Sequence, residues 1–138
     1  MQTFRPVYLV SSCLVGLCTR YDGQLKESVD CLARLKDVVW LPVCPEQLGG
    51  LPTPREAADI IGGDGNDVLD GKARVMTKSG LDLTREFIHG ARQVLQIAQS
   101  QNIHKAFLKA RSPSCGLGST IGVTAALLRN NNVEITEF

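Results

Sequence analysis

The chain has 138 residues, of which 43% are hydrophobic, and its formal net charge is +1. A chain of this length is typical of one domain that buries about two-thirds of the surface its unfolded form exposes, so we expect it to fold without disulfide bonds. Near-neutral charge excludes the dominant basic field of a nucleic-acid-binding protein. No apolar run approaches the roughly 20 residues of a membrane span or resembles a signal core, so we expect a cytoplasmic location.

The N-terminal part predicts a strand, a helix and a second strand. Apolar and β-branched residues predict a buried strand over Val7–Ser12 and a second strand over Val38–Val43. Between them, helical spacing of apolar residues predicts a short helix over Ser28–Leu35. The apolar positions of this helix are Val29, Leu32 and Leu35, with Cys31 beside them.

The middle of the chain predicts irregular structure followed by a long helix. The segment "CPEQLGGLPTPR", 44–55, is too rich in Gly and Pro for a regular element. The segment "DVLDGKARV" resembles a hairpin that turns at Asp70–Gly71. A stripe of apolar residues then predicts a helix over Leu83–Gln101, which Asp82 or Thr84 can cap. The stripe consists of Leu83, Phe87, Ala91, Val94, Leu95 and Ala98.

The C-terminal part predicts a strand at Ala106–Lys109, a helix from about Ser119 to Arg129 and a last strand at Val133–Thr136. Alternating strands and helices imply a mostly parallel sheet with helices on its faces. The sequence therefore predicts a single α/β domain over residues 1–138.

Three of the five cysteines follow predicted strands. Cys13 and Cys44 lie at the carboxyl ends of the first two strands, and Cys115 lies a few residues beyond the strand at Ala106–Lys109. In an open parallel sheet, the carboxyl ends of neighbouring strands border one crevice. We therefore expect these three thiols, far apart in sequence, to meet at one edge of the fold.

Three converging thiolates require positive charge, which a metal ion or cluster supplies. Soft thiolates select zinc, Cu(I) or an iron–sulfur cluster. The chain lacks both the C-x-x-C pairs typical of zinc sites and the compact ferredoxin spacing. A four-iron cluster held by three thiolates would leave one iron open to a substrate atom. The spacing favours a metal centre without selecting its kind.

The other two cysteines have different expected roles. Cys31 lies on a predicted helix and is expected to be a buried core residue. Cys18 forms a C-x4-C interval with Cys13, so it can be a fourth ligand, a buried thiol or a residue beside the centre.

Four motifs, in order and over nearly the whole chain, resemble the DUF523 family, which includes the thiouracil desulfidases. They are "SSCLVGLCTRYDG" at 11–23, "CPEQLGGLPTPR" at 44–55, "LKARSPSCG" at 108–116 and "GVTAALL" at 122–128. The resemblance implies a Rossmann-like three-layer α/β sandwich. It also implies a [4Fe–4S] cluster on Cys13, Cys44 and Cys115, with one open iron, and removal of sulfur from thiolated pyrimidines such as 2- or 4-thiouracil.

One segment departs from the family pattern. Family members usually carry a longer insert after "SPSCG", often with Tyr-Asp-Gly, whereas only "LGSTI" separates Gly116 from Gly122 here. Because that insert would lie near the cluster, we expect its loss to affect substrate specificity.

The expected reaction is hydrolysis, in which water attacks the thiocarbonyl carbon and hydrosulfide leaves. Glu46 is the predicted acid–base group, although it can instead cap loop amides or pair with Arg55. Ser112 is predicted to orient the reacting atoms, although a loop-closing turn explains it equally. The predicted substrate-binding residues are Ser12, Arg20, Tyr21, Asp22, Arg55, Lys109 and Ser114.

Some of these residues have structural alternatives. Arg20 and Asp22 can hold their own loop as an ion pair, Arg55 can pair with Glu46 or Glu56, and Lys109 can simply end a strand.

The expected partner is a small thiolated nucleobase or nucleoside, and neither a membrane nor a large nucleic acid is expected to bind. The chain is expected to be a monomer or a homodimer. Two other functions remain open: a Cys-persulfide sulfurtransferase with Cys115 as nucleophile, and a non-catalytic metal- or cluster-binding regulatory module.

Overall fold

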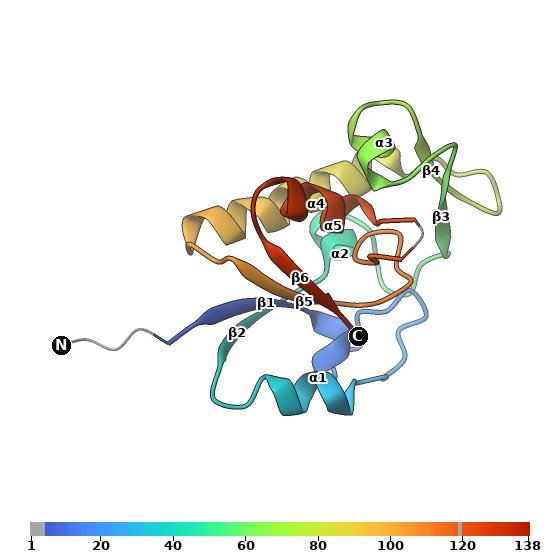
Figure 1. The fold of residues 1–138 in the computed structure, drawn as a ribbon. Helices are drawn as coiled ribbons and strands as arrows, with labels where there is room; N and C mark the ends of the chain where they lie inside the picture. Colours follow the sequence, from blue (N-terminus) through green and yellow to red (C-terminus); the bar gives the residue numbers. More distant parts are fainter. Residues whose placement is uncertain (1–4, 119) are drawn as a thin grey trace.

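A computed structural model describes residues 5–118 and 120–138 and contains a four-stranded parallel sheet (Figure 1). The strands lie in the order β2-β1-β5-β6, and each neighbouring pair is parallel. Their bounds are Val7–Ser11 (β1), Val39–Val43 (β2), Lys105–Leu108 (β5) and Glu134–Glu137 (β6). The predicted parallel α/β sheet is therefore confirmed.

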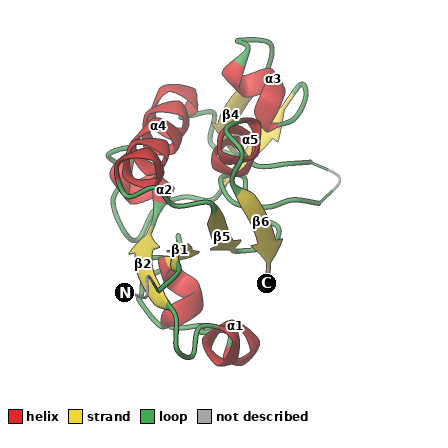
Figure 2. Ribbon diagram, turned by 60° about the vertical axis from the view of Figure 1, so that its left-hand side comes forward, coloured by secondary structure: helices red, strands yellow, loops and turns green. Residues whose placement is uncertain are grey.

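Helices cover both faces of this sheet (Figure 2). Helices α2 (Pro45–Leu48), α4 (Thr84–Ser100) and α5 (Val123–Asn130) lie on one face. Helix α1 (Val29–Arg34) and the 3-10 turn η1 (Ser12–Val15) lie on the other. The sheet is thus the middle of three layers, as in the predicted sandwich.

The alternation of side chains along the strands builds the two cores. Leu9 of β1 packs into the core beneath α4 and α5, whereas the next residue, Val10, packs into the core beneath α1. Both side chains are 0% exposed. Because successive residues of a strand point to opposite faces, apolar runs without alternation are the pattern of strands buried on both sides.

Helix α4 confirms the predicted long helix and its apolar stripe, since Phe87, Ala91, Val94 and Ala98 are buried. Leu83 occupies the N-cap position, but Asp82 does accept a free N–H of the first turn, since its Oδ1 lies 3.0 Å from the Thr84 backbone nitrogen. The Thr84 hydroxyl instead accepts the Val75 backbone N–H and donates to Asp82. Neither α4 nor another helix in the described ranges is long and apolar enough to cross a membrane.

The hairpin predicted at Asp70–Gly71 is wrong. Residues Gly65–Leu69 form helix α3, which begins with a capping box in which Asp64 and Asp67 each accept the other's backbone N–H. Asp70–Gly71 ends this helix, with Gly71 at φ +77°. Asp-Gly serves a helix C-terminus as well as a hairpin, because both need a left-handed residue.

Two antiparallel strands flank α3 and form a second, small sheet. Strand β3 (Ala58–Ile61), which the sequence did not predict, pairs with β4 (Arg74–Thr77). Together with α3 they cover the outer side of α4 and α5 around buried Val68 and Val75. The sequence missed β3 because it has four residues directly before a glycine-rich turn.

The segment 44–55 also contains an unpredicted element, the single turn of α2. Pro45 begins this turn, where its missing N–H removes no helical hydrogen bond. Helix α2 contacts α4 closely, since a Cβ atom on Gly90 would lie 1.9 Å from the Pro45 carbonyl oxygen. Glycine at position 90 therefore permits the contact that positions the residues after β2.

The other boundaries shift by a few residues. Helix α1 buries Cys31 and Leu35 and exposes Val29 and Leu32, so the predicted apolar face is wrong by about one position. Helix α5 begins at Val123 rather than Ser119 because Gly122 is its N-cap, and Ser119 itself lies outside the described residues.

We predict that Gly90→Ala lowers the free energy of unfolding by about 1–3 kcal/mol, because the added methyl group overpacks the α2–α4 contact. Helix propensity alone would raise it by up to about 1 kcal/mol, so the sign separates the two effects. Urea unfolding measures the change. The exposed Gln96→Ala on the same helix is the control, with less than about 0.5 kcal/mol expected, and an unchanged or more stable Gly90→Ala protein would contradict the contact.

Candidate thiol-lined active site

Cys13, Cys44 and Cys115 line one cavity of about 370 Å³ at the carboxyl ends of β1, β2 and β5. The predicted convergence of the three thiols is therefore found in the fold. The volume is typical of a small-molecule site. Seven other predicted site residues also line the cavity: Ser12, Arg20, Tyr21, Glu46, Arg55, Lys109 and Ser112.

Each thiol is placed by the end of a different strand. Cys13 follows β1 in the 3-10 turn η1, and Cys44 is the N-cap of α2 directly after β2. Cys115 lies in the turn between β5 and α5, where a Cβ atom on Gly122 would approach its backbone nitrogen to 2.8 Å. Because glycine has no side chain, Gly122 allows the start of α5 to contact this turn.

Cys115 is buried, whereas Cys13 and Cys44 are partly buried, and the thiols influence one another electrostatically. Cys115 is only 3% exposed, and burial raises the pKa of its thiol to about 12, with smaller upward contributions from Cys13, Glu46 and Cys44. Burial and then Cys44 raise the pKa of Cys13, while Lys109 and Arg20 oppose the shift. Stable thiolates in this cavity therefore need further positive charge.

The arrangement of ligands does not match a mononuclear site. Within residues 5–118 and 120–138, no three His, Cys, Asp or Glu side chains gather closely enough to hold one metal ion. A polynuclear cluster differs, because each thiolate binds a separate iron. The three soft donors on one cavity wall therefore fit a cluster better than a single zinc ion.

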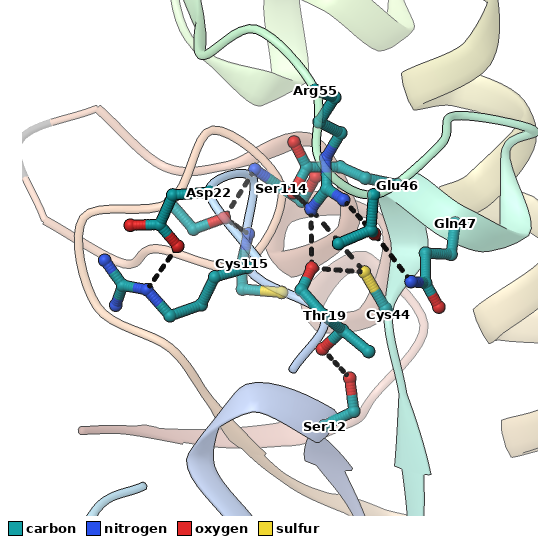
Figure 3. A network of polar contacts seen from close by, with 12 residues as sticks. Ser12, Thr19, Asp22, Cys44, Glu46, Gln47, Arg55, Ser114 and Cys115 are labelled. Carbon is teal, nitrogen blue, oxygen red and sulfur yellow. Dashed lines mark hydrogen bonds and ion pairs between the residues drawn. The ribbon is translucent and has the colours of Figure 1, made fainter. Parts of the chain in front are cut away.

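Arg55 joins the loops around Cys44 (Figure 3). Its Nη2 lies 3.1 Å from Glu46 Oε2, 2.8 Å from the Thr19 carbonyl oxygen and 3.8 Å from Cys44 Sγ. Its Nη1 donates to Thr53 Oγ1 at 2.9 Å. The Arg55 side chain is 5% exposed and that of Glu46 is 18% exposed, so this ion pair is shielded from water. The predicted alternative, an Arg55–Glu46 pair, is present.

Ser112 closes the turn that carries Cys115. Its hydroxyl oxygen accepts the backbone N–H groups of Ser114 and Cys115, each at 3.1 Å. A serine hydroxyl has two acceptor sites and one donor, so this bonding leaves the O–H of Ser112 for an acceptor in the cavity. The structural and the substrate-orienting interpretation of Ser112 are therefore compatible.

Two predicted substrate-binding residues do not line the cavity. Asp22 pairs with Arg20 at 3.5 Å and accepts the backbone N–H of Gln24, as the structural alternative suggested. Ser114 is buried beside Cys115.

The predicted residues that do line the cavity have varied contacts. The Ser12 hydroxyl bonds that of Thr19 at 2.5 Å. The Lys109 backbone N–H donates to Ser11 Oγ, which ties β5 to β1, while its ammonium donates to the Ala110 carbonyl. Tyr21 is 44% exposed at the cavity rim.

The other two cysteines lie away from the cavity wall. Cys31 is fully buried in the core beneath α1, as predicted, and burial raises its pKa to about 11. Cys18 is exposed, and it does not belong to the cavity lining. Its position gives no support to a fourth ligand.

Sequence reasoning missed several cavity residues, among them the polar residues Ser11, Thr19, Asp59 and Arg111. Thr19 adjoins a predicted site residue, so its place in "CTRYD" was a usable signal. Asp59 reaches the cavity from β3, and Arg111 has a left-handed backbone with φ +62°. Asp59 belongs to no motif, because only the packing of the small sheet brings it to the cavity. Arg111 lies within the motif "LKARSPSCG" at 108–116, directly before Ser112, so its position was a usable signal.

The parallel α/β sheet and the three thiols at its carboxyl edge place this protein among α/β proteins with a thiol-lined site. A family model described as 2-thiouracil desulfurase matches residues 8–137. The chain therefore belongs to the 2-thiouracil desulfurase family. The family resemblance seen in the motifs is confirmed.

Two similar proteins support this assignment. A curated relative, uncharacterized protein YbbK of Bacillus subtilis (strain 168), is 43% identical and the match spans 88% of each chain. A solved structure of a [4Fe-4S]-dependent thiouracil desulfidase, TudS, is 36% identical with a TM-score of 0.78. That match covers 96% of this chain and 91% of TudS.

We predict that Ser112→Ala lowers the free energy of unfolding of the metal-free protein by about 1–3 kcal/mol, because two N–H groups of a buried turn lose their acceptor. Urea unfolding measures the loss. The exposed Ser100→Ala at the end of α4 is the matched control, with less than about 0.5 kcal/mol expected. Equal stabilities of the two variants would mean that Ser112 does not hold the turn.

Proposed function

We propose that this protein is an iron–sulfur-dependent desulfidase that converts a thiolated pyrimidine, of the 2- or 4-thiouracil or thiouridine type, into the oxo base and releases hydrosulfide. The observation that carries the proposal is the meeting of Cys13, Cys44 and Cys115 in one cavity with Glu46. Family membership and the likeness to a [4Fe-4S]-dependent thiouracil desulfidase support it.

Cys13, Cys44 and Cys115 would hold a [4Fe–4S] cluster as its three protein ligands. The donor chemistry fits, since all three are soft thiols from separate loops and no mononuclear arrangement exists in the described parts of the chain. When bound, such a cluster supplies a Lewis-acidic iron that polarises a carbon–sulfur bond. Lys109 and Arg20 already favour the thiolate form of Cys13 by their positive charge.

Glu46 would exchange protons with the attacking water and the ring nitrogen. Arg55 occupies its Oε2, which leaves the other carboxylate oxygen for proton transfer. Replacing the thiocarbonyl sulfur with the oxygen of water yields the oxo base and hydrosulfide and requires no net electron transfer. One carboxylate that accepts a proton and then returns it can therefore perform both proton transfers of the reaction.

Ser112 and Tyr21 would orient the base. The free O–H of Ser112 can donate to a ring heteroatom, because its two acceptor sites are already used. Tyr21 offers an aromatic face at the cavity rim for a flat pyrimidine. The cavity accommodates a small molecule, which agrees with a nucleobase or nucleoside rather than a large nucleic acid.

A persulfide sulfurtransferase fits the cavity less well. Its nucleophile would need an accessible thiol of low pKa, whereas Cys115 is almost fully buried with its pKa raised to about 12.

Anaerobic purification followed by iron and sulfide analysis tests the cluster. Hydrosulfide release from 2-thiouracil and 4-thiouracil then tests the activity, and a non-catalytic binding module would carry iron without releasing hydrosulfide.

We predict that serine at position 13, 44 or 115 lowers iron content from about four atoms per chain to less than about one, since each thiol holds a separate iron. Iron and sulfide analysis with visible absorbance measures the change. Cys18→Ser is the matched control and should retain full iron, because Cys18 is exposed away from the cavity. Loss of iron only in the Cys18 variant would reassign the ligand set.

We predict that Glu46→Gln lowers kcat by about 10²–10⁴-fold, because the amide cannot take a proton from water. Its iron content should equal that of the wild type, which separates chemistry from cluster binding. The rate of hydrosulfide release measures the effect, and Glu134→Gln on the exposed side of β6 is the control. Wild-type turnover by the Glu46 variant would exclude Glu46 as the acid–base group.

A further inference from the structure

Arg55 forms several hydrogen bonds and one ion pair with protein groups around the site. Its Nη2 faces three acceptors from two loops: the Thr19 carbonyl, Glu46 Oε2 and Cys44 Sγ. Its Nη1 donates to the Pro52 carbonyl and Thr53 Oγ1, and its backbone N–H donates to the Tyr21 carbonyl at 2.7 Å. Both terminal nitrogens of the guanidinium therefore have protein acceptors (Figure 3), whereas Nε is buried without a partner among the described residues.

We infer that Arg55 is a positioning residue that acts through both Glu46 and Cys44, rather than a residue that binds substrate. The inference rests on the proposed function, because it assigns Cys44 to the cluster and Glu46 to proton transfer. Through Nη2, Arg55 fixes one oxygen of Glu46 and places a cationic N–H beside the Cys44 sulfur.

The Thr19 carbonyl shows why arginine suits this position. The Cys44 thiol donates to that carbonyl at 3.7 Å, a bond that disappears when the thiol becomes a ligand and loses its proton. Arg55 Nη2 also donates to the same carbonyl at 2.8 Å, so this partly buried oxygen keeps a partner in both states. Lysine has one nitrogen and cannot reproduce the two-sided contacts of a planar guanidinium.

Solvent shielding argues against direct substrate binding. The Arg55 side chain is 5% exposed, and its two terminal nitrogens already contact protein acceptors. Arg20 and Lys109 also line the cavity, and their positive charges are available to a substrate or a cluster. Hydrogen bonds to the sulfur ligands of a cluster influence its reduction potential, so Arg55 should affect a property that a purely structural residue would not.

The test compares Arg55→Met and Arg55→Lys with wild type, using anaerobically purified protein. Arg74→Met is the control, because Arg74 forms an exposed ion pair with Asp82 far from Cys44 in sequence and 70% of its side chain is accessible. Redox titration measures the midpoint potential of the cluster. Steady-state kinetics with 2-thiouracil or 4-thiouracil measure kcat and KM separately. The change in kcat caused by Arg55→Met is also measured in a Glu46→Gln background.

A positioning role predicts a more negative midpoint potential for Arg55→Met, a kcat lowered by about 10–100-fold and a KM within about threefold of wild type. Arg55→Lys should recover part of kcat because it keeps the charge. In the Glu46→Gln background, Arg55→Met should lower kcat much less, because the two residues act as a unit. A folded Arg55→Met protein that loses iron while the Arg74 variant keeps it also supports the role.

An unchanged potential with an unchanged kcat, or a raised KM with an unchanged kcat, would overturn the positioning role and leave the proposed function intact. Wild-type protein that binds no iron would overturn the cluster instead, and the action of Arg55 through Cys44 with it. Wild-type protein that binds iron but releases no hydrosulfide would refute the desulfidase activity, while the midpoint potential would still decide whether Arg55 acts on Cys44.

Discussion

The parallel pairing of β1 with β2 and β5 is the constraint on which the site depends. Ser11 of β1 lies opposite Val43 of β2, so Cys13 and Cys44 leave the sheet at nearly the same level. On the other side, the Lys109 backbone N–H donates to Ser11 Oγ and fixes the exit of β5, the strand that leads to Cys115. A change of register in either pair would separate the thiols.

Close backbone contacts transmit this alignment to the loops. Gly90 lets α4 approach the Pro45 carbonyl, which fixes the turn after Cys44. Gly122 lets the start of α5 contact the turn of Cys115, whose backbone N–H also donates to Ser112. The residues that shape the site are therefore held by helices whose own stability comes from the core beneath them.

The cavity combines one buried and two partly buried thiols with positive side chains. Burial raises the pKa of the Cys115 and Cys13 thiols, whereas Arg20 and Lys109 lower that of Cys13. Such a balance suits a site that becomes charged only when a cationic centre enters it. Arg55 adds a buried donor at Cys44, and its pairing with Glu46 links the ligand set to the proposed proton transfer.

Sequence patterns predicted most of the main fold and the convergence of the thiols. Apolar runs marked β1 and the edge strand β2, and an apolar stripe marked α4, because apolar residues gather where these elements pack in the sheet and on its core. Patterns failed at Asp70–Gly71, where the same dipeptide suits a hairpin or a helix end, and at β3, which is too short to show periodicity. The cytoplasmic location, the single domain and the oligomeric state stay predictions.

The sequence by itself determined which residues reach the carboxyl edge of the sheet and the family to which they point, because strand ends and motifs are local features. Only the tertiary structure decided that Arg55 faces Glu46, Thr19 and Cys44 together and that Asp22 and Cys18 lie outside the cavity. These outcomes depend on contacts between loops distant in sequence, and no local pattern encodes which partner a buried polar group will find.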